Sequence, residues 1–412
     1  MRVRRDRIDR EWVAAAGGAG LAVVGWVVGG RYVAVAGVLV VFTALLLWVW
    51  GRESLGGVDY VRTLSRRRAT FGESVTLEVE LVNDKPLPLT WLHVREQVPA
   101  TLRVEGGTVV STGWRTELQF VVAMLPYQRI HRRLRVCCDQ RGEHIFGPAE
   151  LRSGSPLGTR EQRREVRNET SLLVYPKVVP LSEPLVAARV PVADRRVRSS
   201  LSLDPTRVVG VRAYTPGDPV RHVDWRATAR RGELLVRVHE PATTLGVAVF
   251  VDLLPPARAR VGIAPDLTEL VVSVAASIVS SLVGARVPAG IFVNGTSRGR
   301  LVAIPTSAAA GALPSMLEAL ARVTTAGAVA IERVLAEQGP RLGAGTSALV
   351  VAADFPDRTH AALAALRRRT SVRAVWIATP AGHGPPDGSL DDRWVVAHHD
   401  GWRDRDVFEL RT

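Results

Sequence analysis

Two long apolar runs stand near the beginning of the chain. Residues 12–30 and 32–50 each contain nineteen residues without a charge. As α-helices they would be about 28 Å long, close to the roughly 30 Å hydrocarbon thickness of a bilayer. Arg31 alone separates them, beside two glycines that favour a tight turn. The pattern predicts a transmembrane helical hairpin over residues 1–55, because a cleaved signal peptide needs only about half of this apolar length.

Arginine is distributed unevenly around this hairpin. Five arginines precede the first run and five follow the second, whereas the turn holds only Arg31. The positive-inside rule then places both ends in the cytoplasm. We therefore expect a multi-pass protein of the plasma (inner) membrane, which contacts lipid through its hairpin and keeps the bulk of its chain cytoplasmic. Gly25 and Gly29 form a GxxxG pair that would let the helices approach closely, although simple spacing explains it equally well.

From residue 56 to 180 the dominant pattern is alternation. In residues 74–83, SVTLEVELVN, apolar and polar side chains fall on opposite faces of an extended chain, and IHRRLRVCCD at 130–139 does the same. Clusters of glycine, proline and asparagine divide these runs. Several short strands of this kind predict a β-sandwich. This middle region shows no cluster of acids or histidines suited to catalysis.

The pattern changes again in residues 243–412. Continuous apolar runs such as LGVAVFVDL at 245–253 are typical of strands buried on both faces of a parallel sheet, and they alternate with segments of helical period. We expect a doubly wound α/β sheet, in which ligands bind beyond the carboxyl ends of the strands. Asp252 and Asp354 end two of the predicted strands, so both should face one crevice, where a divalent cation would need oxygen ligands.

A charged segment over residues 181–242 connects these two regions. Within it, TPGD at 215–218 predicts a tight turn, and Asp218 is expected to cap a short helix that begins at Pro219 and ends at Gly232. Val220 and Val223 would then face inward. We expect the acids and arginines of this segment to pair with one another, so that they fix a turn, a helix and a strand. A solvated charged loop is the alternative interpretation.

Charge and composition exclude several functions without selecting one. The net charge is +14 and the sequence pI is about 11, but almost all of the positive charge is arginine, with Lys85 and Lys177 as the only lysines. The arginines are scattered and no aromatic platform accompanies them, so nucleic-acid binding is not expected. No glycine-rich phosphate loop follows the first predicted α/β strand, and neither GxSxG nor HExxH is present. We therefore expect no cofactor and no enzyme.

The connector carries a spacing that resembles a known family, the domain of unknown function 58. Its residues here are Gly210, Arg212, Tyr214, Gly217, Asp218, Arg221, Val223, Trp225, Ala229, Arg230, Leu234, Val236, Arg237 and Glu240. SGSPLG at 153–158 is similar to the family's Asp-Pro-x-Gly turn, with Ser155 where an acid is usual. The resemblance implies a membrane hairpin, a β-sandwich and a von Willebrand factor A-like α/β domain. It also implies partnership with MoxR-type AAA+ ATPases, beside which such proteins are commonly encoded.

One departure from that pattern concerns metal binding. The metal site of A-type domains resembles Asp-x-Ser-x-Ser, whereas this chain has Asp252 followed by Leu253, Leu254, Pro255 and Pro256. Leucine and proline cannot coordinate Mg²⁺, so Asp252 and Asp354 are weak metal candidates. The sequence thus favours a non-enzymatic, membrane-anchored adaptor that docks a cytoplasmic protein. A divalent-metal-dependent, adhesion-type ligand-binding domain is the alternative.

Overall fold

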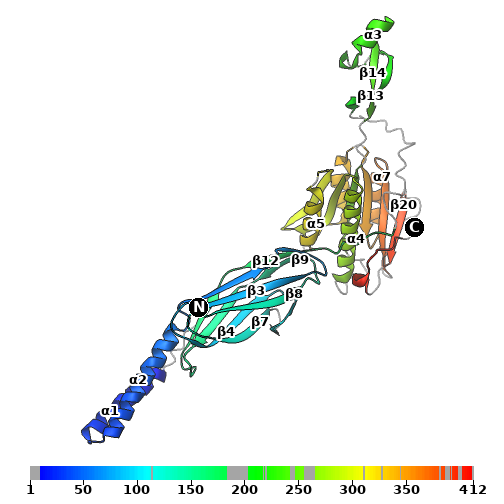
Figure 1. The fold of residues 1–412 in the computed structure, drawn as a ribbon. Coiled ribbons are helices and arrows are strands. Elements are labelled where there is room, and N and C mark those ends of the chain that lie inside the picture. Colours follow the sequence, from blue (N-terminus) through cyan, green and yellow to red (C-terminus); the bar gives the residue numbers. More distant parts are fainter. Residues whose placement is uncertain are drawn as a thin grey trace. The chain divides into compact units, whose positions relative to one another are not determined.

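The structure is a computed structural model (Figure 1). It describes residues 10–112, 115–182, 203–216, 218, 220–241, 246–254, 265–309, 311–325, 328–343, 345–379, 382–385, 390, 392–397 and 401–410. The chain divides into two compact units, Met1–Pro176 and Lys177–Thr412.

The first unit begins with two apolar helices that pack against each other. These are α1 (Arg10–Val27) and α2 (Arg31–Glu53). Their backbones approach closely where glycine removes the side chain, since a Cβ on Gly25 or Gly37 would lie 2.4 Å from a backbone nitrogen of the other helix. Gly29 instead occupies the turn, with φ +76° and open space around it, so only Gly25 of the GxxxG pair makes the close approach.

Helix α2 is long and apolar enough to cross a membrane, with a mean hydropathy of 2.5 and little of its surface buried. Helix α1 is apolar but shorter. A third helix, α4 (Pro265–Gly284), also passes the test of length and composition, but most of it is buried in the second unit. Length and composition therefore favour membrane association for the N-terminal pair and a core position for α4.

The rest of the first unit is built from strands. They are β1 (Val58–Leu64), β2 (Arg68–Thr70), β3 (Ser74–Asn83), β4 (Leu89–Val98), β5 (Arg103–Glu105), β6 (Thr108–Thr112), β7 (Arg115–Met124), β8 (Arg129–Cys137), β9 (Gly142–Phe146), β10 (Ala149–Gly154), β11 (Glu161–Val166) and β12 (Thr170–Tyr175). They form sheets of order β1-β3-β8-β5, β11-β10-β4-β7-β6 and β2-β12-β9. All three sheets contribute to one apolar core. The alternation seen in residues 74–83 is therefore the inward and outward face of β3, as in a β-sandwich.

An ion pair is buried inside this core. The side chains of Arg62 and Glu96 are both fully buried, and the Arg62 guanidinium and the Tyr60 hydroxyl both donate to the Glu96 carboxyl. Buried charges of this kind are tolerated only when they are paired and hydrogen-bonded. The pair joins β1 and β4, which lie in different sheets.

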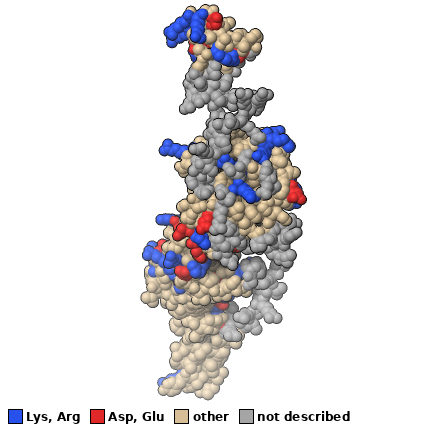
Figure 2. Space-filling view, turned by 90° about the vertical axis from the view of Figure 1, so that its right-hand side faces the viewer, with Lys and Arg blue, Asp and Glu red and all other residues tan. Residues whose placement is uncertain are grey.

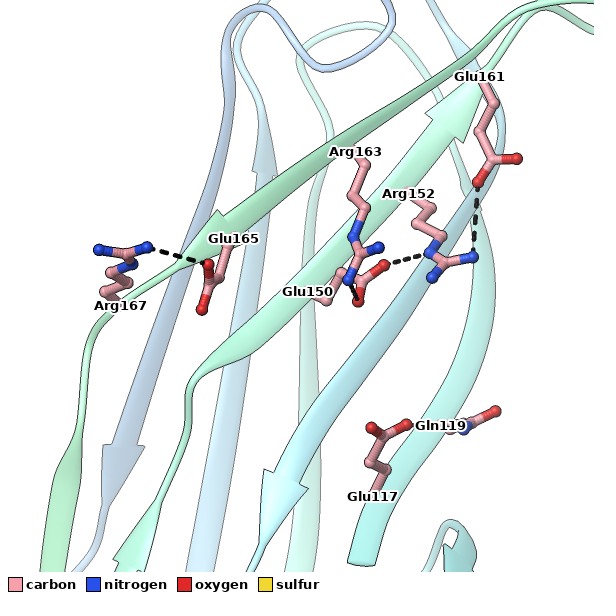
Figure 3. Close-up of polar contacts among 8 residues, drawn as sticks. All are labelled: Glu117, Gln119, Glu150, Arg152, Glu161, Arg163, Glu165 and Arg167. Atoms are coloured by element: carbon pink, nitrogen blue, oxygen red, sulfur yellow. Dashed lines mark hydrogen bonds and ion pairs between the residues drawn. The ribbon is translucent and has the colours of Figure 1, made fainter. Parts of the chain in front are cut away.

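The outer face of β10 and β11 carries charges in a diagonal arrangement (Figure 3). The antiparallel register places like charges directly opposite, Arg152 beside Arg163 and Glu150 beside Glu165. Arg163 and Arg152 instead pair diagonally across the strands, whereas Glu165 pairs with Arg167 of its own segment. The Arg163 Nη2 atom donates to Glu150 at 2.6 Å, and Arg152 lies 3.9 Å from Glu161 and also contacts Glu150. These diagonal pairs hold β10 and β11 together as a hairpin.

Both lysines of the chain bind main-chain oxygens. The Lys85 ammonium donates to the carbonyls of Glu53, Ser54 and Gly56 at 2.7, 2.5 and 2.7 Å, and so caps the carboxyl end of α2. The Lys177 ammonium donates to the carbonyls of Arg403 and Arg405. A compact ammonium with three donors suits such converging carbonyls better than the planar fork of arginine.

The second unit contains a six-stranded sheet with helices on both faces (Figure 1). Its strands are β15 (Val247–Val251), β16 (Ala289–Ser297), β17 (Arg300–Ser307), β18 (Ser347–Ala352), β19 (Val372–Ala378) and β20 (Asp392–Ala397). Their order is β17-β16-β15-β18-β19-β20, with only β17 antiparallel. Helices α4 and α5 (Ala312–Arg322) pack on one face, and α6 (Ile331–Gln338) and α7 (Asp357–Arg367) on the other. The strand order reverses beside β15, where a doubly wound sheet opens a crevice.

The sequence signature forms a separate small element of this unit. It consists of β13 (Leu203–Ala213), the 3₁₀ turn η1 (Val220–His222), α3 (Trp225–Arg231) and β14 (Leu235–Pro241). Strands β13 and β14 form their own two-stranded sheet. Short 3₁₀ turns also occur at η3 (Gly339–Arg341) and η4 (Trp402–Asp404). We call β13, η1, α3 and β14 with their connections, residues 203–241, the signature module.

The buried ion pair leads to a test with a matched control. Gly147 has φ +96°, and a Cβ there would lie 2.6 Å from the Arg62 guanidinium; Gly72 has φ +84° and open space. Gly72→Ala should cost about 1 kcal/mol, for the backbone alone. Gly147→Ala should cost about 1–3 kcal/mol more, because its Cβ crowds the Arg62 guanidinium and the Asn168 carbonyl oxygen, the latter at 2.7 Å. Equal losses in chemical denaturation of the full chain would contradict the tight packing around Arg62.

Candidate functional site

Arg212 and Asp218 fix the first bend of the signature module. Two guanidinium nitrogens of Arg212 donate to the two carboxylate oxygens of Asp218, each at 2.6 Å. The backbone nitrogen and the hydroxyl of Thr215 donate to the same carboxylate at 2.9 Å. The donors from Arg212 and then from Thr215 hold the pKa of Asp218 well below its usual value of 3.8. Asp218 is thus a structural acceptor in the turn.

Asp224 fixes the second bend in the same way. Its Oδ1 atom accepts from the backbone nitrogens of Arg226 and Ala227, both at 3.1 Å, so Asp224 is the N-cap of α3. Its Oδ2 atom accepts from the Arg237 Nε on β14 at 3.0 Å. Helix α3 ends at Gly232, which adopts φ +73° as its C-cap. One carboxylate therefore joins the start of the helix to the neighbouring strand.

These contacts leave a basic and apolar surface exposed. Val223, Leu235 and Val236 are buried inside the module. The Trp225 and Val220 side chains are 63% and 64% exposed. Exposed basic side chains of α3 lie on the same module, namely Arg226, Arg230 and Arg231, and Figure 2 shows basic side chains gathered on it. Large aromatic and arginine side chains together are enriched in protein–protein interfaces.

Two details of the predicted connector are wrong. The helix begins at Trp225 and not at Pro219, and its cap is Asp224, because Asp218 is already occupied by Arg212 and Thr215. Val220 faces solvent, because a 3₁₀ turn and not the helix carries it. The end of the helix at Gly232 and the pairing of acids with arginines agree with expectation.

Other signature residues contribute less to this geometry. The Tyr214 backbone nitrogen donates to the Leu234 carbonyl at 2.8 Å, and Arg230 lies exposed near the end of α3. Gly217 and the side chains of Arg221 and Glu240 lie outside the described residues. The described contacts thus pair two signature residues, Arg212 and Asp218. They also pair the signature residue Arg237 with Asp224, which is not one of the signature positions.

A second candidate site lies at the carboxyl edge of the six-stranded sheet. Asp252 follows β15 and Asp354 follows β18, and these strands are neighbours. Asp252 Oδ1 accepts from the Asn294 side-chain amide at 2.6 Å and from the Leu254 backbone nitrogen at 3.0 Å. The Asn294 Oδ1 atom accepts in turn from the Leu253 backbone nitrogen at 2.8 Å. Burial raises the pKa of Asp252 to about 7, with Glu332 and Asp354 contributing.

Asp354 is also held by neighbouring donors. Its Oδ1 atom accepts from the His383 backbone nitrogen at 2.7 Å, and the His383 ring Nδ1 lies 2.9 Å from the same atom. Glu332 on α6 accepts from the Thr359 hydroxyl at 2.5 Å and lies 3.2 Å from the Arg358 Nε. Within the described ranges, no group of three or more His, Cys, Asp or Glu side chains has metal-binding geometry. Pro255 and Pro256 lie outside those ranges.

Three of these crevice residues were not anticipated from sequence. Asn294 interrupts the apolar run IFVNG, and a polar residue near the end of a buried strand is a signal that could have identified it. Glu332 and His383 stand in segments with no distinguishing spacing. They reach the crevice only through the packing of α6 and the segment after β19.

Comparisons with known proteins agree with the signature. Residues 210–391 match the family model described as Protein of unknown function DUF58. Uncharacterized protein YeaD of Bacillus subtilis (strain 168) is 27% identical over 248 residues, which cover 58% of this chain and 56% of that protein. These matches support the DUF58 family. The DUF58 match includes Arg212, Asp218, Asp252 and Asp354, but the chain spans only about half the length of the curated relative.

Solved structures add no functional argument. A cohesin module from a Clostridium perfringens ATCC13124 family 33 glycoside hydrolase covers 28% of this chain and 96% of its own, with 6% identity and a TM-score of 0.21. A non-cellulosomal cohesin from Archaeoglobus fulgidus covers 28% of this chain and 91% of its own, with 11% identity and a TM-score of 0.20. Similarity at this level does not bear on what residues 210–391 bind.

The Asp218 carboxylate gives the signature module a predicted acid sensitivity. Because its folded pKa lies below the usual 3.8, the stability that its contacts contribute is complete above about pH 4 and is lost progressively as pH falls from there through the folded pKa. Amide-exchange protection at Thr215, corrected for the intrinsic rate, should therefore decline below pH 4. In Asp218→Asn it should be reduced already at pH 7. Equal protection at pH 7 in both proteins would refute the role of the carboxylate.

Asp252 predicts the opposite dependence on pH. The native state keeps this proton to about pH 7, whereas the unfolded chain releases it near 3.8. The native state therefore binds more protons between these values, and the free energy of unfolding should fall as pH rises from 5 to 8. Asp252→Asn should flatten this slope and be more stable than the parent at pH 8, by on the order of 2–4 kcal/mol.

The fully exposed Asp357 supplies the matched control. Asp357→Asn should leave the slope between pH 5 and 8 unchanged. Chemical denaturation at the two pH values measures both variants, and a parental slope in Asp252→Asn would show that Asp252 is ionised at neutral pH.

Proposed function

We propose that this chain is a membrane-anchored, non-enzymatic adaptor whose cytoplasmic part docks another protein, a MoxR-type AAA+ ATPase. The α/β region would act as a von Willebrand factor A-like domain and the signature module as part of its docking surface. The N-terminal hairpin would place this surface at the inner face of the plasma membrane.

The observation that carries this proposal is that the two aspartates of the signature module, Asp218 and Asp224, are both engaged in hydrogen bonds. Asp218 and Asp224 are each occupied by an arginine and by backbone donors. A carboxylate engaged in this way is a poor general base, because its pKa is lowered and its lone pairs are already used. The acids therefore serve to hold the backbone in shape.

The exposed residues of the module support a protein partner. Trp225 and Val220 present apolar area to solvent, and the arginines of α3 expose positive charge on the same module. An exposed tryptophan on a basic module would suit a partner with an apolar pocket and acidic side chains. Nucleic acid is a weaker candidate, because this module offers one exposed tryptophan and not a row of aromatic rings.

The crevice of the α/β region would contribute shape and not chemistry. Asp252 is occupied by Asn294 and Leu254, and its raised pKa weakens its affinity for a cation at neutral pH. Asp354 is engaged by His383. This arrangement supports a docking role over the metal-dependent alternative.

Binding to a purified MoxR-type ATPase tests the proposal. The full chain in detergent should bind it. Trp225→Ala should raise the dissociation constant at least tenfold, as expected for a tryptophan at the centre of an interface. Val121→Ala is the matched control, since Val121 lies on β7 and is 62% exposed. Biolayer interferometry measures all three proteins. Equal affinity of the folded Trp225→Ala variant would remove the module from the interface, and no binding by the parent would refute the partner.

A further inference from the structure

A pocket of about 440 Å³ lies inside the first unit, between the helical hairpin and the loop that joins β10 to β11. Its lining residues are Glu11, Ala14, Leu39, Val40, Thr43, Ala44, Leu47, Leu157 and Thr159. The pocket is of the size that encloses part of an organic ligand. Its walls are almost wholly apolar, with Glu11 as the one charged residue among them.

Glu11 presents an unsatisfied oxygen in this pocket. The residue is only 4% exposed. Its Oε1 atom accepts from the Thr159 hydroxyl at 2.6 Å, while its Oε2 atom is buried without a hydrogen-bond partner among the described residues. An unpaired carboxyl oxygen in an apolar site is costly, so the site calls for a donor. A ligand group with N–H bonds and a positive charge would supply both hydrogen bonds and charge.

The opposite wall suits a hydrocarbon chain. The α2 residues of the lining recur at helical spacing and so form one face of that helix. Thr43 adds no free polarity, because its hydroxyl already donates to the Leu39 carbonyl at 2.8 Å. Leu157, at the tip of the loop, is 72% exposed. An exposed leucine beside exposed apolar helices fits the interfacial region of a bilayer.

Positive charge lies beside the end of the hairpin that holds Glu11, on Arg52 near the end of α2 and on Arg160 of the β10–β11 loop. Trp12, next to Glu11, packs edge-on against Trp48 with centroids 5.9 Å apart. The guanidinium groups of Arg52 and Arg160 lie 5.4 and 5.9 Å from the Trp48 ring. This end of the hairpin therefore offers a carboxyl oxygen for a cation and guanidinium groups for a phosphate. Together they match the two charges of a zwitterionic phospholipid headgroup.

The loop that closes the pocket is held in place from both sides. The Ser155 hydroxyl oxygen accepts from the backbone nitrogens of Thr159 and Arg160 at 3.0 and 3.2 Å. The Gln162 side chain binds the Leu55 backbone nitrogen at 3.3 Å and the Arg52 carbonyl at 2.5 Å, so β11 is joined to the end of α2. The diagonal charges of Figure 3 fix the hairpin behind the loop. Hydrogen bonds and ion pairs therefore hold the walls of the pocket in place.

We propose that this pocket binds a phospholipid with a primary ammonium headgroup, such as phosphatidylethanolamine. The ammonium donates to Glu11 Oε2 and part of an acyl chain lies along α2. The proposal rests on the membrane anchoring that forms part of the proposed function. Phosphatidylcholine has the same charges but no N–H bond, and therefore cannot satisfy the Glu11 oxygen.

Native mass spectrometry of the full chain tests this assignment. The detergent-solubilised protein is mixed with equal amounts of dioleoyl phosphatidylethanolamine, phosphatidylcholine and phosphatidylglycerol. The parent should retain one phosphatidylethanolamine with about tenfold preference over each of the others. Glu11→Gln should abolish the preference, whereas Glu53→Gln, at an exposed glutamate on the end of α2, should keep it. Ala44→Phe should fill the pocket and prevent retention of any lipid.

The lipid site and the membrane anchor can be tested separately. Equal retention of the three lipids by the parent, or an unchanged preference in Glu11→Gln, overturns the assignment of the pocket, and the parent result does not depend on how any variant folds. Flotation with liposomes of the same three lipids tests the anchor by itself. A chain that fails to float overturns anchoring and lipid site together. A chain that floats without headgroup preference overturns the lipid site alone.

Discussion

Pairing between arginine and oxygen is the interaction on which this structure depends. The sequence supplies 54 basic side chains against 40 acids, and arginine engages the acids at several structural junctions. Arg62 and Glu96 join two sheets inside the first unit, and Arg212 with Asp218 and Arg237 with Asp224 hold the bends of the signature module. The Arg212 guanidinium binds both oxygens of Asp218 at once, so this pair sets a direction as well as a distance.

This pairing explains why conspicuous charge does not by itself indicate catalysis. The signature is rich in charged residues, yet Asp218 and Asp224 use their lone pairs to hold backbone nitrogens and arginines. What remains accessible is Trp225 and positive charge. The carboxylates at the edge of the six-stranded sheet are also hydrogen-bonded, Asp252 by Asn294 and Asp354 by His383. Both arrangements support the docking role that we propose.

The sequence predicted helices and strands well where a single hydrophobic pattern extended over a long segment. Alternation identified strands such as β3, and continuous apolar runs identified β15 and β18, because burial on one or both faces determines those patterns. The short α3 was misplaced by six residues. Asp218 and Asp224 are both good caps, and only the contact between Asp218 and Arg212 decides between them. The contacts of Asp224 with Arg237 and of Asn294 with Asp252 could not be predicted, because the partners are distant in sequence.

Lys85 and Lys177 have a further consequence for the chemistry of the whole chain. They are its only side-chain primary amines, and both are already bound to main-chain carbonyls, one at the foot of α2 and the other within the second unit. Acetylation of either would remove the charge and the donors that hold those carbonyls. Among the side chains, an amine-directed reagent would therefore modify only these two lysines, and its reaction would report on the two contacts that they make. The arginines, which supply the rest of the positive charge, would not react.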